Sequence, residues 1–290
     1  MFVDSRNISE DILVNILIKE ALRCPICGAE IEIEDRSLFC KGAKKHCYDL
    51  ASSGYVNLSA PGQSNGGDSK GAVRARSAFL DTQHYRPISD GICRLIEKHC
   101  ADDALVIDAG CGEGYYSTAI AKSGCSVAGF DLSKFACEAA AKRAKREGLD
   151  NAFFGVASVF DMPLADGCAD AVVNVFAPCV EQEYSRVLKD DGILMVVYAG
   201  PDHLLGLKRA IYEQTHTNEE RADLPKNMKE IDRERFQFKI KVSGNENIKN
   251  LFAMTPYYWR TSQSDVEKLD FLGELESEID IIFAIYKKEI

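Results

Sequence analysis

A run of glycines and acids at residues 108–114 has the side-chain types and spacing of a ligand-binding loop. An acid ends an apolar stretch, and three glycines at alternate positions follow, with Glu113 between the last two. Alternate glycines allow backbone torsions that other residues resist, so the chain can approach a ligand closely. A dinucleotide site would read G-x-G-x-x-G and would bring a phosphate next to Glu113, which repels it. The order found here favours S-adenosylmethionine, which has no phosphate and carries cationic groups; an ordinary strand-to-helix turn is the alternative. The residues concerned are Asp108, Gly110, Gly112, Glu113 and Gly114.

Strands and helices are expected to alternate around this loop. An acid, Asp131, closes the second expected strand, where a carboxylate can accept both ribose hydroxyls of a nucleoside. Because such folds bind ligands at the carboxyl ends of parallel strands, Asp131 and the glycine loop should lie together. Ser158, after the third strand, is a further candidate cofactor contact.

Strands are expected at 104–109, 126–130, 153–156, 170–176 and 193–199, and helices at 115–122, from Ser133 to Gly148 and at about 180–188. This alternation predicts an α/β, Rossmann-like class I methyltransferase domain with a parallel sheet. Residues 278–287 are expected to end the chain as an antiparallel strand at the sheet edge.

The end of the fourth expected strand faces the methyl group in this fold. Asn174 and the backbone around Pro178 could hold the edge of a planar base, and Phe176 could stack on it. A buried strand ended by proline, with Asn174 bonded to nearby backbone, is the equally weighted alternative. Asp161, after the third strand, is a further candidate proton acceptor.

A separate cluster of metal-ligand residue types lies near the N-terminus. Cys24 and Cys27 are two residues apart on a Pro-Ile turn followed by glycine, and Cys40 and His46 follow at longer spacing. Three thiolates and one imidazole fit a closed, structural zinc site. Cys47 is an alternative fourth ligand, and a metal-free knuckle is the alternative to zinc. Redox chemistry is less favoured, because the cysteine pair does not open a helix within a βαβ unit.

Composition limits the class of protein. The chain has 290 residues, 11 cysteines and a formal net charge of −10. It has neither an apolar run long enough to cross a bilayer nor an export signal, so a cytoplasmic protein with reduced thiols is expected. The net charge disfavours a large nucleic-acid surface, although basic residues gather locally. Candidate phosphate contacts are Lys44, Lys45, Arg74 and Arg76, with Trp259 as a candidate base-stacking residue.

Three regions are expected along the chain. Residues 1–58 hold an amphipathic N-terminal helix, within 1–20, and the zinc-binding module. Residues 59–70 are rich in Gly, Ser and Asn and predict a flexible linker. Residues 71–290 are expected to form the methyltransferase domain.

The chain resembles the bacterial 23S rRNA guanine-N(1)-methyltransferases of the RlmA type over nearly its whole length after residue 23. The resemblance rests on CPIC at 24–27, GYVNL at 54–58, GDS at 67–69, ARSAFLD at 75–81, HYRP at 84–87, DAGCGEGYY at 108–116, FAPC at 176–179, GPDHL at 200–204 and MTPYYWR at 254–260. Two features depart from the pattern: the longer spacing between Cys40 and His46, and the 23 residues before Cys24.

This resemblance implies a zinc module that helps to recognise RNA and a Rossmann-like methyltransferase domain. It implies a homodimer acting on a 23S rRNA hairpin. The lack of an apolar run long enough to cross a bilayer predicts no membrane partner. By position, the resemblance implies zinc ligands at Cys24, Cys27, Cys40 and His46, and cofactor contacts at Tyr85, Glu113, Gly114 and His203. Two other functions remain open from the residues: a small-molecule methyltransferase of the same fold, and a non-catalytic RNA-binding module that carries zinc.

Overall fold

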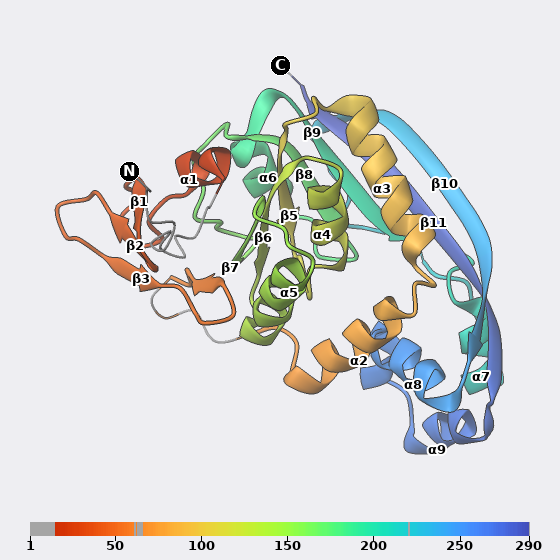
Figure 1. The fold of residues 1–290 in the computed structure, drawn as a ribbon. Coiled ribbons are helices and arrows are strands. Elements are labelled where there is room, and N and C mark those ends of the chain that lie inside the picture. The colour runs from red at the N-terminus through yellow and green to blue at the C-terminus, as the bar shows by residue number, and fades with distance from the viewer. Residues whose placement is uncertain (1–14, 61, 63–65, 220, 290) are drawn as a thin grey trace, which may run out of the picture.

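The computed structural model describes residues 15–60, 62, 66–219 and 221–289 (Figure 1). These residues form a three-stranded sheet near the N-terminus and an eight-stranded sheet that makes up the body of the molecule. Most of the helix expected within residues 1–20 lies outside the described residues, and its last part is α1, Ile16–Ala21.

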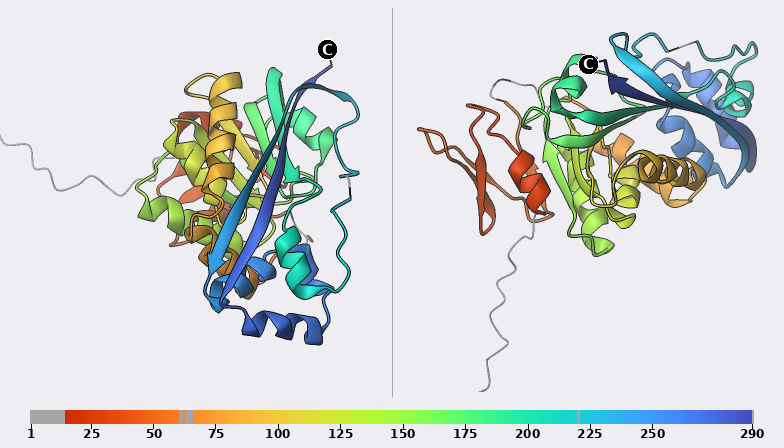
Figure 2. Two further views of the ribbon diagram at one scale, coloured as in Figure 1. Left: turned by 90° about the vertical axis from the view of Figure 1, so that its right-hand side faces the viewer. Right: turned by 90° about the horizontal axis from the view of Figure 1, so that it is seen from above.

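The small sheet is antiparallel, with the order β1-β2-β3. Its strands are β1, Ile31–Glu34, β2, Ser37–Cys40, and β3, Cys47–Asp49. Figure 2 shows this sheet at one side of the molecule, beside α1. It has few large buried side chains of its own, Ile31 and Leu38 among them, so its contacts with the body must contribute to its stability.

The large sheet has the strand order β10-β11-β9-β8-β5-β6-β7-β4. Six neighbouring strands, β9 to β4 in that order, are parallel, and those in the middle are buried on both faces, as their nearly continuous apolar sequences predict. Their bounds are β4, Tyr55–Asn57, β5, Leu105–Ala109, β6, Ser126–Asp131, β7, Ala152–Val156, β8, Ala169–Val175, and β9, Leu188–Ala199. The expected Rossmann-like fold is confirmed.

The last strand differs from its expected place. β11, Glu274–Lys288, is antiparallel to β9 as expected, but β10, Met228–Ser243, pairs along its other side. β10, not the last strand, is therefore the edge of the sheet. Its many Lys, Arg and Glu residues suit a half-exposed edge, because charged side chains discourage pairing with other chains.

Helices cover both faces of the sheet. On one face lie α3, Arg86–His99, and α4, Tyr115–Lys122, with α7, Leu205–Ile211, and α8, Asn245–Ala253. α3 buries Ile88, Ile92 and Leu95, three residues at helical spacing. On the opposite face lies α6, Glu181–Val187. The remaining helices are α2, Lys70–Asp81, α5, Lys134–Arg146, α9, Gln263–Val266, and two 3₁₀ turns, Pro256–Trp259 and Glu267–Phe271.

The connection from β7 to β8 has no helix, although parallel strands are usually joined by one. α1 packs in its place: Ile18 and Leu22 are fully buried against the same face as α6, and Leu22 pairs with Leu164 of the connection. The N-terminal region is also joined to the body by β4, which pairs with β7 in the large sheet. Residues 1–58, expected to form the zinc-binding module, thus also supply β4, the edge strand of the large sheet beside β7.

Candidate functional site

The glycine loop joins the end of β5 to α4. Gly110, Gly112 and Gly114 have φ angles of 87°, 53° and 74°, a region that disfavours side chains. A Cβ atom on Gly110 would lie 2.6 Å from Cβ of Ala177, and one on Gly114 would lie 2.8 Å from Cβ of Ala140. Glycine is therefore required at these positions both by torsion and by space, and the loop bends where a ligand would meet the strand ends.

Two acids lie at the adjoining ends of β5 and β6. Asp108 is buried and accepts a hydrogen bond from the Ser117 hydroxyl of α4. Burial raises its pKa to about 7, against the effect of that hydrogen bond, and the neighbouring acids Asp131 and Glu113 add to the rise. Asp131 accepts hydrogen bonds from the N–H groups of Gly112 (3.1 Å) and Ser133 (2.7 Å). Burial raises the Asp131 pKa as well. The expected proximity of Asp131 and the glycine loop is thus present.

The third acid, Glu113, has a partner that the sequence did not indicate. Its carboxylate is almost fully buried and forms an ion pair with Arg76 of α2, which also pairs with Asp68 before that helix. Burial alone would lower the Arg76 pKa, but Glu113 and Asp68 raise it above its usual value. Arg76, expected at an RNA surface, instead lies against the glycine loop. The pairing joins residues 37 apart in sequence, and no local pattern in the sequence indicates it.

The end of the linker is held at the same place. The Ser133 hydroxyl donates to the carbonyl oxygen of Asp68 (2.7 Å). Gly67 has a φ of 92°, and a Cβ atom there would lie 2.7 Å from the Ser133 nitrogen. Ser133 therefore contacts both Asp131 and the residues before α2.

Tyr85 and His203, implied as cofactor contacts, are both buried and adjacent. The Tyr85 hydroxyl lies 3.3 Å from Nε2 of His203. The other ring nitrogen, Nδ1, accepts from the N–H of Asp280 (3.3 Å), which leaves the ring proton on Nε2. Burial lowers the His203 pKa to about 4, in spite of the nearby Asp280, so the ring is neutral at pH 7. His203 then donates to the Tyr85 hydroxyl oxygen.

Phe176, directly after β8, packs one face on this histidine. The two rings are stacked with centroids 5.9 Å apart and planes inclined by 27°. Phe176 has a φ of 53°, a rare conformation for an aromatic residue, and its side chain is 42% exposed. A strained, half-exposed aromatic residue next to the glycine loop is the arrangement expected of a binding surface.

Asn174 and Pro178 are part of the framework beneath Phe176. The Asn174 amide donates to the carbonyl oxygen of Pro178 (2.9 Å), which also accepts from the Tyr184 hydroxyl (2.9 Å). The Asn174 side-chain oxygen accepts from Arg221 at 3.3 Å, and Arg221 also donates to the carbonyl of Ala177 (2.6 Å). Because Asn174 is fully buried and already hydrogen-bonded at both ends, it fixes the 176–179 turn in this arrangement.

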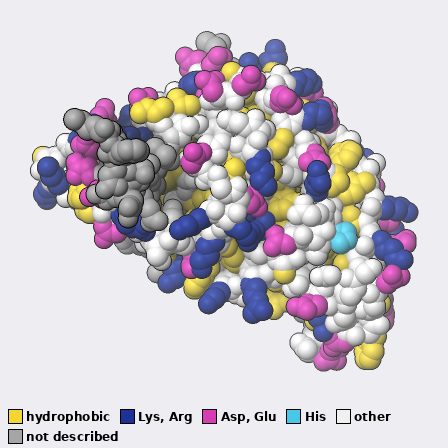
Figure 3. Space-filling model, viewed as in Figure 1, with side chains coloured by type: hydrophobic (Ala, Val, Ile, Leu, Met, Phe, Trp, Pro, Cys, Tyr) yellow, Lys and Arg dark blue, Asp and Glu magenta, His cyan; other side chains and the backbone are white. Residues whose placement is uncertain are grey.

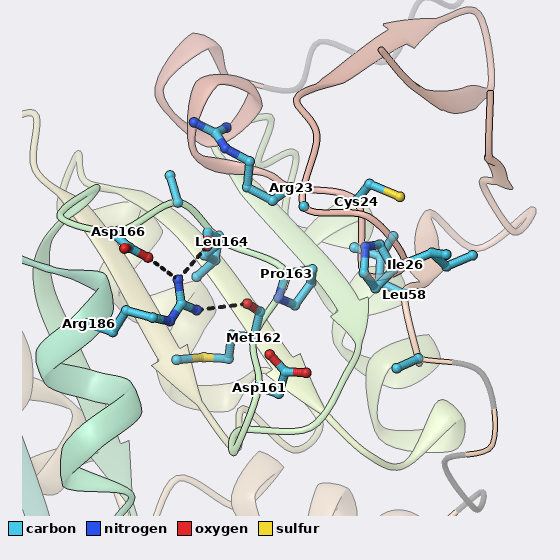
Figure 4. Close-up of a pocket in the computed structure, with 14 residues that line it drawn as sticks. Arg23, Cys24, Ile26, Leu58, Asp161, Met162, Pro163, Leu164, Asp166 and Arg186 are labelled. Atoms are coloured by element: carbon cyan, nitrogen blue, oxygen red, sulfur yellow. Dashed lines mark hydrogen bonds and ion pairs between the residues drawn. The ribbon is translucent and has the colours of Figure 1, made fainter. Parts of the chain in front are cut away.

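Asp161 and Ser158 follow β7, so β5 and β6 lie between them and β8. Ser158 is buried, and its hydroxyl oxygen accepts from the N–H of Phe160 (3.2 Å). Asp161 is exposed and lines a groove of about 570 Å³ between the N-terminal region and the body (Figure 4). Cys24, Ile26 and Leu58 line its other side. This groove is separate from the glycine loop.

The four expected metal ligands meet in the N-terminal region. Nδ1 of His46 lies 3.4 Å from Sγ of Cys24, 3.6 Å from Sγ of Cys27 and 3.4 Å from Sγ of Cys40. The Cys27 and Cys40 sulfurs are 3.8 Å apart. Tetrahedral zinc, with Zn–S and Zn–N distances near 2.3 and 2.0 Å, requires separations of about 3.8 Å between sulfurs and about 3.5 Å from sulfur to nitrogen. The donor set and its spacing therefore fit zinc.

Cys47, the alternative ligand, lies outside this cluster. Its side chain is exposed and contacts the Asp49 carboxylate, with Sγ and Oδ1 3.7 Å apart. Strand alternation explains the difference, because neighbouring residues at the start of a strand point to opposite sides.

The other basic candidates are at the surface. Lys44 and Lys45 are exposed between β2 and β3, and Arg74 is exposed on α2. Trp259, in the 3₁₀ turn Pro256–Trp259, is 74% exposed. Figure 3 shows Lys and Arg side chains gathered over the middle of one face, over α5 and α2. Exposed basic residues of these two helices are Lys70, Arg74, Lys134, Lys142, Lys145 and Arg146.

The fold and the glycine loop with its acids define a class I S-adenosylmethionine-dependent methyltransferase, to which a zinc-ribbon module is joined. The methyltransferase-domain family matches residues 101–254, and the family described as "RlmA, N-terminal" matches residues 22–64. The chain belongs to the 23S rRNA guanine-N(1)-methyltransferase family.

Three relatives support this membership. A protein of Streptomyces fradiae named 23S rRNA (guanine(748)-N(1))-methyltransferase is 31% identical over 278 residues, which cover 91% of this chain and 95% of the relative. Relatives from Micromonospora griseorubida and Bacillus subtilis carry the name 23S rRNA (guanine-N(1)-)-methyltransferase as a provisional assignment. They are 34% and 28% identical, and the matches cover 64% and 92% of this chain and 68% and 96% of the relatives.

Proposed function

We propose that this enzyme transfers a methyl group from S-adenosylmethionine to N(1) of a guanine in a 23S rRNA hairpin. The observation that carries this proposal is the 31% identity to a named guanine-N(1)-methyltransferase over 95% of that protein, which includes both the zinc module and the methyltransferase domain. A small-molecule methyltransferase of the same fold would have no need of the module that the family match places at residues 22–64.

The residues at the ends of β5 and β6 fit the cofactor. When bound, S-adenosylmethionine supplies an electrophilic methyl group on a cationic sulfur. The three glycines with positive φ leave room at the loop, and Asp131 and Asp108 offer carboxylates for hydroxyl and ammonium groups. Gly110, Gly112, Glu113, Gly114, Tyr85, His203 and Ser158 complete the proposed cofactor contacts.

The target base is proposed to bind at the turn after β8. The exposed face of Phe176 can stack on a base, because His203 supports only the other face. Asn174 and Pro178 would act as positioning residues that hold this turn rigid, through the hydrogen bonds between them. Asp161 is the weaker catalytic candidate, since two strands separate its own strand from β8.

N(1) of guanine bears a proton, which must leave as the methyl group arrives. The atom that accepts it must lie within hydrogen-bond reach of the base stacked on Phe176. Backbone carbonyls of the 176–179 turn can accept a hydrogen bond from the N(1)–H group, and solvent at this half-exposed turn can take up the proton.

The N-terminal module is proposed to hold structural zinc through Cys24, Cys27, Cys40 and His46 and to help bind RNA. Lys44, Lys45, Arg74 and Trp259 are exposed and remain proposed RNA contacts. The proposed domains are 1–58, 59–70 and 71–290, with β4 as the strand that ties the first to the last. A cytoplasmic homodimer is proposed on the family resemblance alone. Within the described ranges, no helix has the length and apolarity to span a membrane.

The test uses purified protein, S-adenosylmethionine with a labelled methyl group, and unmodified 23S rRNA. A methyl group on N(1) blocks Watson–Crick pairing, so primer extension should stop at one guanine in the treated RNA only. The matched control is Asp131→Asn, which should remove the label and the stop together because the cofactor is no longer held.

Label in the RNA without a stop at guanine would contradict the assignment to N(1). Absence of label in the RNA, with wild-type protein that binds S-adenosylmethionine, would instead contradict rRNA as the substrate.

A further inference from the structure

The cofactor site contains three acids and a cation that pairs with one of them. Asp108 and Glu113 are buried, Asp131 is half-buried, and Arg76 is the cation paired with Glu113. S-adenosylmethionine has two cationic groups, its sulfonium and its ammonium, but also one anionic group, the carboxylate of its methionine part. A carboxylate among three acids would be repelled unless a donor receives it.

Arg76 has hydrogen-bond donors to spare. Its Nε donates to Glu113, and Nη1 donates to Asp68. Arginine carries five N–H groups, so both hydrogens of Nη2 remain. Nη2 would lie 3.2 Å from a Cβ atom on Gly112, which places it over the middle of the glycine loop. Within the described part of the chain, Nη2 has no hydrogen-bond acceptor.

Other cations near the loop are already committed. Arg143 pairs with Asp81 (2.8 Å) and also donates to the carbonyl oxygen of Glu113 (3.3 Å). His203 is neutral at pH 7, because burial lowers its pKa to about 4, and its ring proton points to Tyr85, so it offers no positive charge. Arg76 is also unsuited to RNA phosphate, because its side chain is 23% exposed and two carboxylates hold it in place.

We propose that Arg76 receives the carboxylate of bound S-adenosylmethionine through Nη2, while Glu113 and Asp68 hold its guanidinium over the glycine loop. This proposal rests on the proposed use of S-adenosylmethionine and adds the residue that recognises its amino-acid end. Glu113 then acts as a positioning residue as well as a loop acid.

A different role for Arg76 predicts a different result. If Arg76 only held Glu113 in place, its loss would disturb the whole pocket and weaken every adenosine ligand alike. If Arg76 receives the carboxylate, its loss weakens only ligands that have one. A series of ligands therefore separates the two roles.

The experiment measures dissociation constants of Arg76→Gln and wild type by calorimetry at low salt. The ligands are S-adenosylmethionine, S-adenosylhomocysteine and 5′-methylthioadenosine, of which only the last lacks the amino-acid end. Arg76→Gln should weaken the first two about tenfold or more, as expected for a lost charge-assisted hydrogen bond, and 5′-methylthioadenosine by less than twofold. Arg76→Lys, which keeps the charge but not the fork of donors, should fall between.

Lys70→Gln is the matched control, since it removes an exposed positive charge from the same helix at a residue outside the proposed sites. It should leave all three constants unchanged. Equal weakening of all three ligands by Arg76→Gln, or no weakening, would overturn the proposal. Thermal unfolding of each variant shows whether it is folded. An intermediate affinity of Arg76→Lys for the two ligands with an amino-acid end shows that the effect depends on the side chain at position 76 and not on misfolding. Wild-type protein that binds none of the ligands would count against the proposed function, not against this role alone.

Discussion

Burial sets the charge of single residues at the cofactor site. Asp108 lies at the end of a fully buried strand, so its charged form loses the stabilisation that water provides. Its hydrogen bond from Ser117 only partly compensates, and its pKa is raised to about 7. The ammonium group of the cofactor should favour the ionised carboxylate, which makes binding depend on pH near neutrality.

We therefore expect S-adenosylhomocysteine to bind more weakly as pH falls below 7. The unliganded protein holds a proton on Asp108 below its pKa of about 7, and that proton must leave on binding. Between pH 7.5 and pH 5.5 the dissociation constant should rise about 25-fold. Calorimetry at both pH values checks this, with Asp108→Asn as the control that should bind weakly and without pH dependence. A pH-independent constant for wild type would contradict the expectation.

Phe176 has a strained backbone conformation at the proposed base-binding surface. Its positive φ costs free energy, yet the turn is held by the hydrogen bonds of Asn174, Tyr184 and Arg221. The aromatic ring is thereby presented half-exposed, with His203 behind it.

Replacing Phe176 by alanine should lower kcat/KM for rRNA about tenfold, because stacking on one base contributes about 1–3 kcal/mol. Affinity for S-adenosylmethionine should change less than twofold, and Phe176→Tyr should retain most activity. Phe271→Ala removes an aromatic residue that is 89% exposed elsewhere and serves as the control. Steady-state kinetics with labelled cofactor measures all four proteins. An unchanged kcat/KM for Phe176→Ala would rule out the stacking role.

At the scale of elements, the residues before α2 and the start of α5 form one junction. Ser133 caps α5 by accepting from the N–H of Ala136 (3.3 Å), and its hydroxyl also donates to the carbonyl of Asp68. Gly67 is needed because a side chain there would collide with Ser133. The end of the linker is thus anchored beside the acid proposed to hold the ribose.

Ser133→Ala should lower the free energy of unfolding by about 1–2 kcal/mol, since it removes both a helix cap and the bond to Asp68. Urea unfolding followed by circular dichroism measures this. Ser262→Ala is a matched control: Ser262 caps the short, exposed α9 by accepting from the N–H of Asp265 and lies far from the junction in sequence. Its effect should be smaller. Equal effects of the two substitutions would show that the junction adds nothing beyond an ordinary cap.

At the scale of the whole molecule, the N-terminal region packs on the face that lacks a β7–β8 helix. α1 covers this face and β4 extends the sheet, so the zinc module sits beside the body at a defined place (Figure 2). Among the described residues, no hydrogen bond or ion pair joins the four candidate zinc ligands to the glycine loop or to its ion-pair partner Arg76. The two sites can therefore be disturbed separately.

His46→Ala should remove stoichiometric zinc and reduce rRNA methylation, while the dissociation constant for S-adenosylhomocysteine stays within twofold. The module has too few buried side chains to keep its shape without metal. Cys47→Ser is the matched control and should retain one zinc ion per chain, because Cys47 points away from the cluster. Metal content by mass spectrometry, with the two assays, checks this. Loss of zinc in Cys47→Ser, or its retention in His46→Ala, would contradict the ligand assignment.

Local patterns in the sequence determined much of this protein. The order of strands and helices from 104 to 199, the glycine loop and the grouping of Cys24, Cys27, Cys40 and His46 were predictable, because each depends on residues close in the chain. The helix cap at Ser133 was predictable for the same reason, because it also depends only on residues close in the chain.

Only the tertiary structure decided which distant residues meet. Arg76, expected at an RNA surface, forms an ion pair with Glu113. Asn174 is hydrogen-bonded within its own turn, and β10 is the edge strand in the place expected of β11. Likewise α1 fills the place of a missing crossover helix, a role that nothing in its own residues indicates. The physical reason is that burial, ion pairing and strand order depend on contacts between segments far apart in sequence, whereas periodicity and capping report only on neighbours.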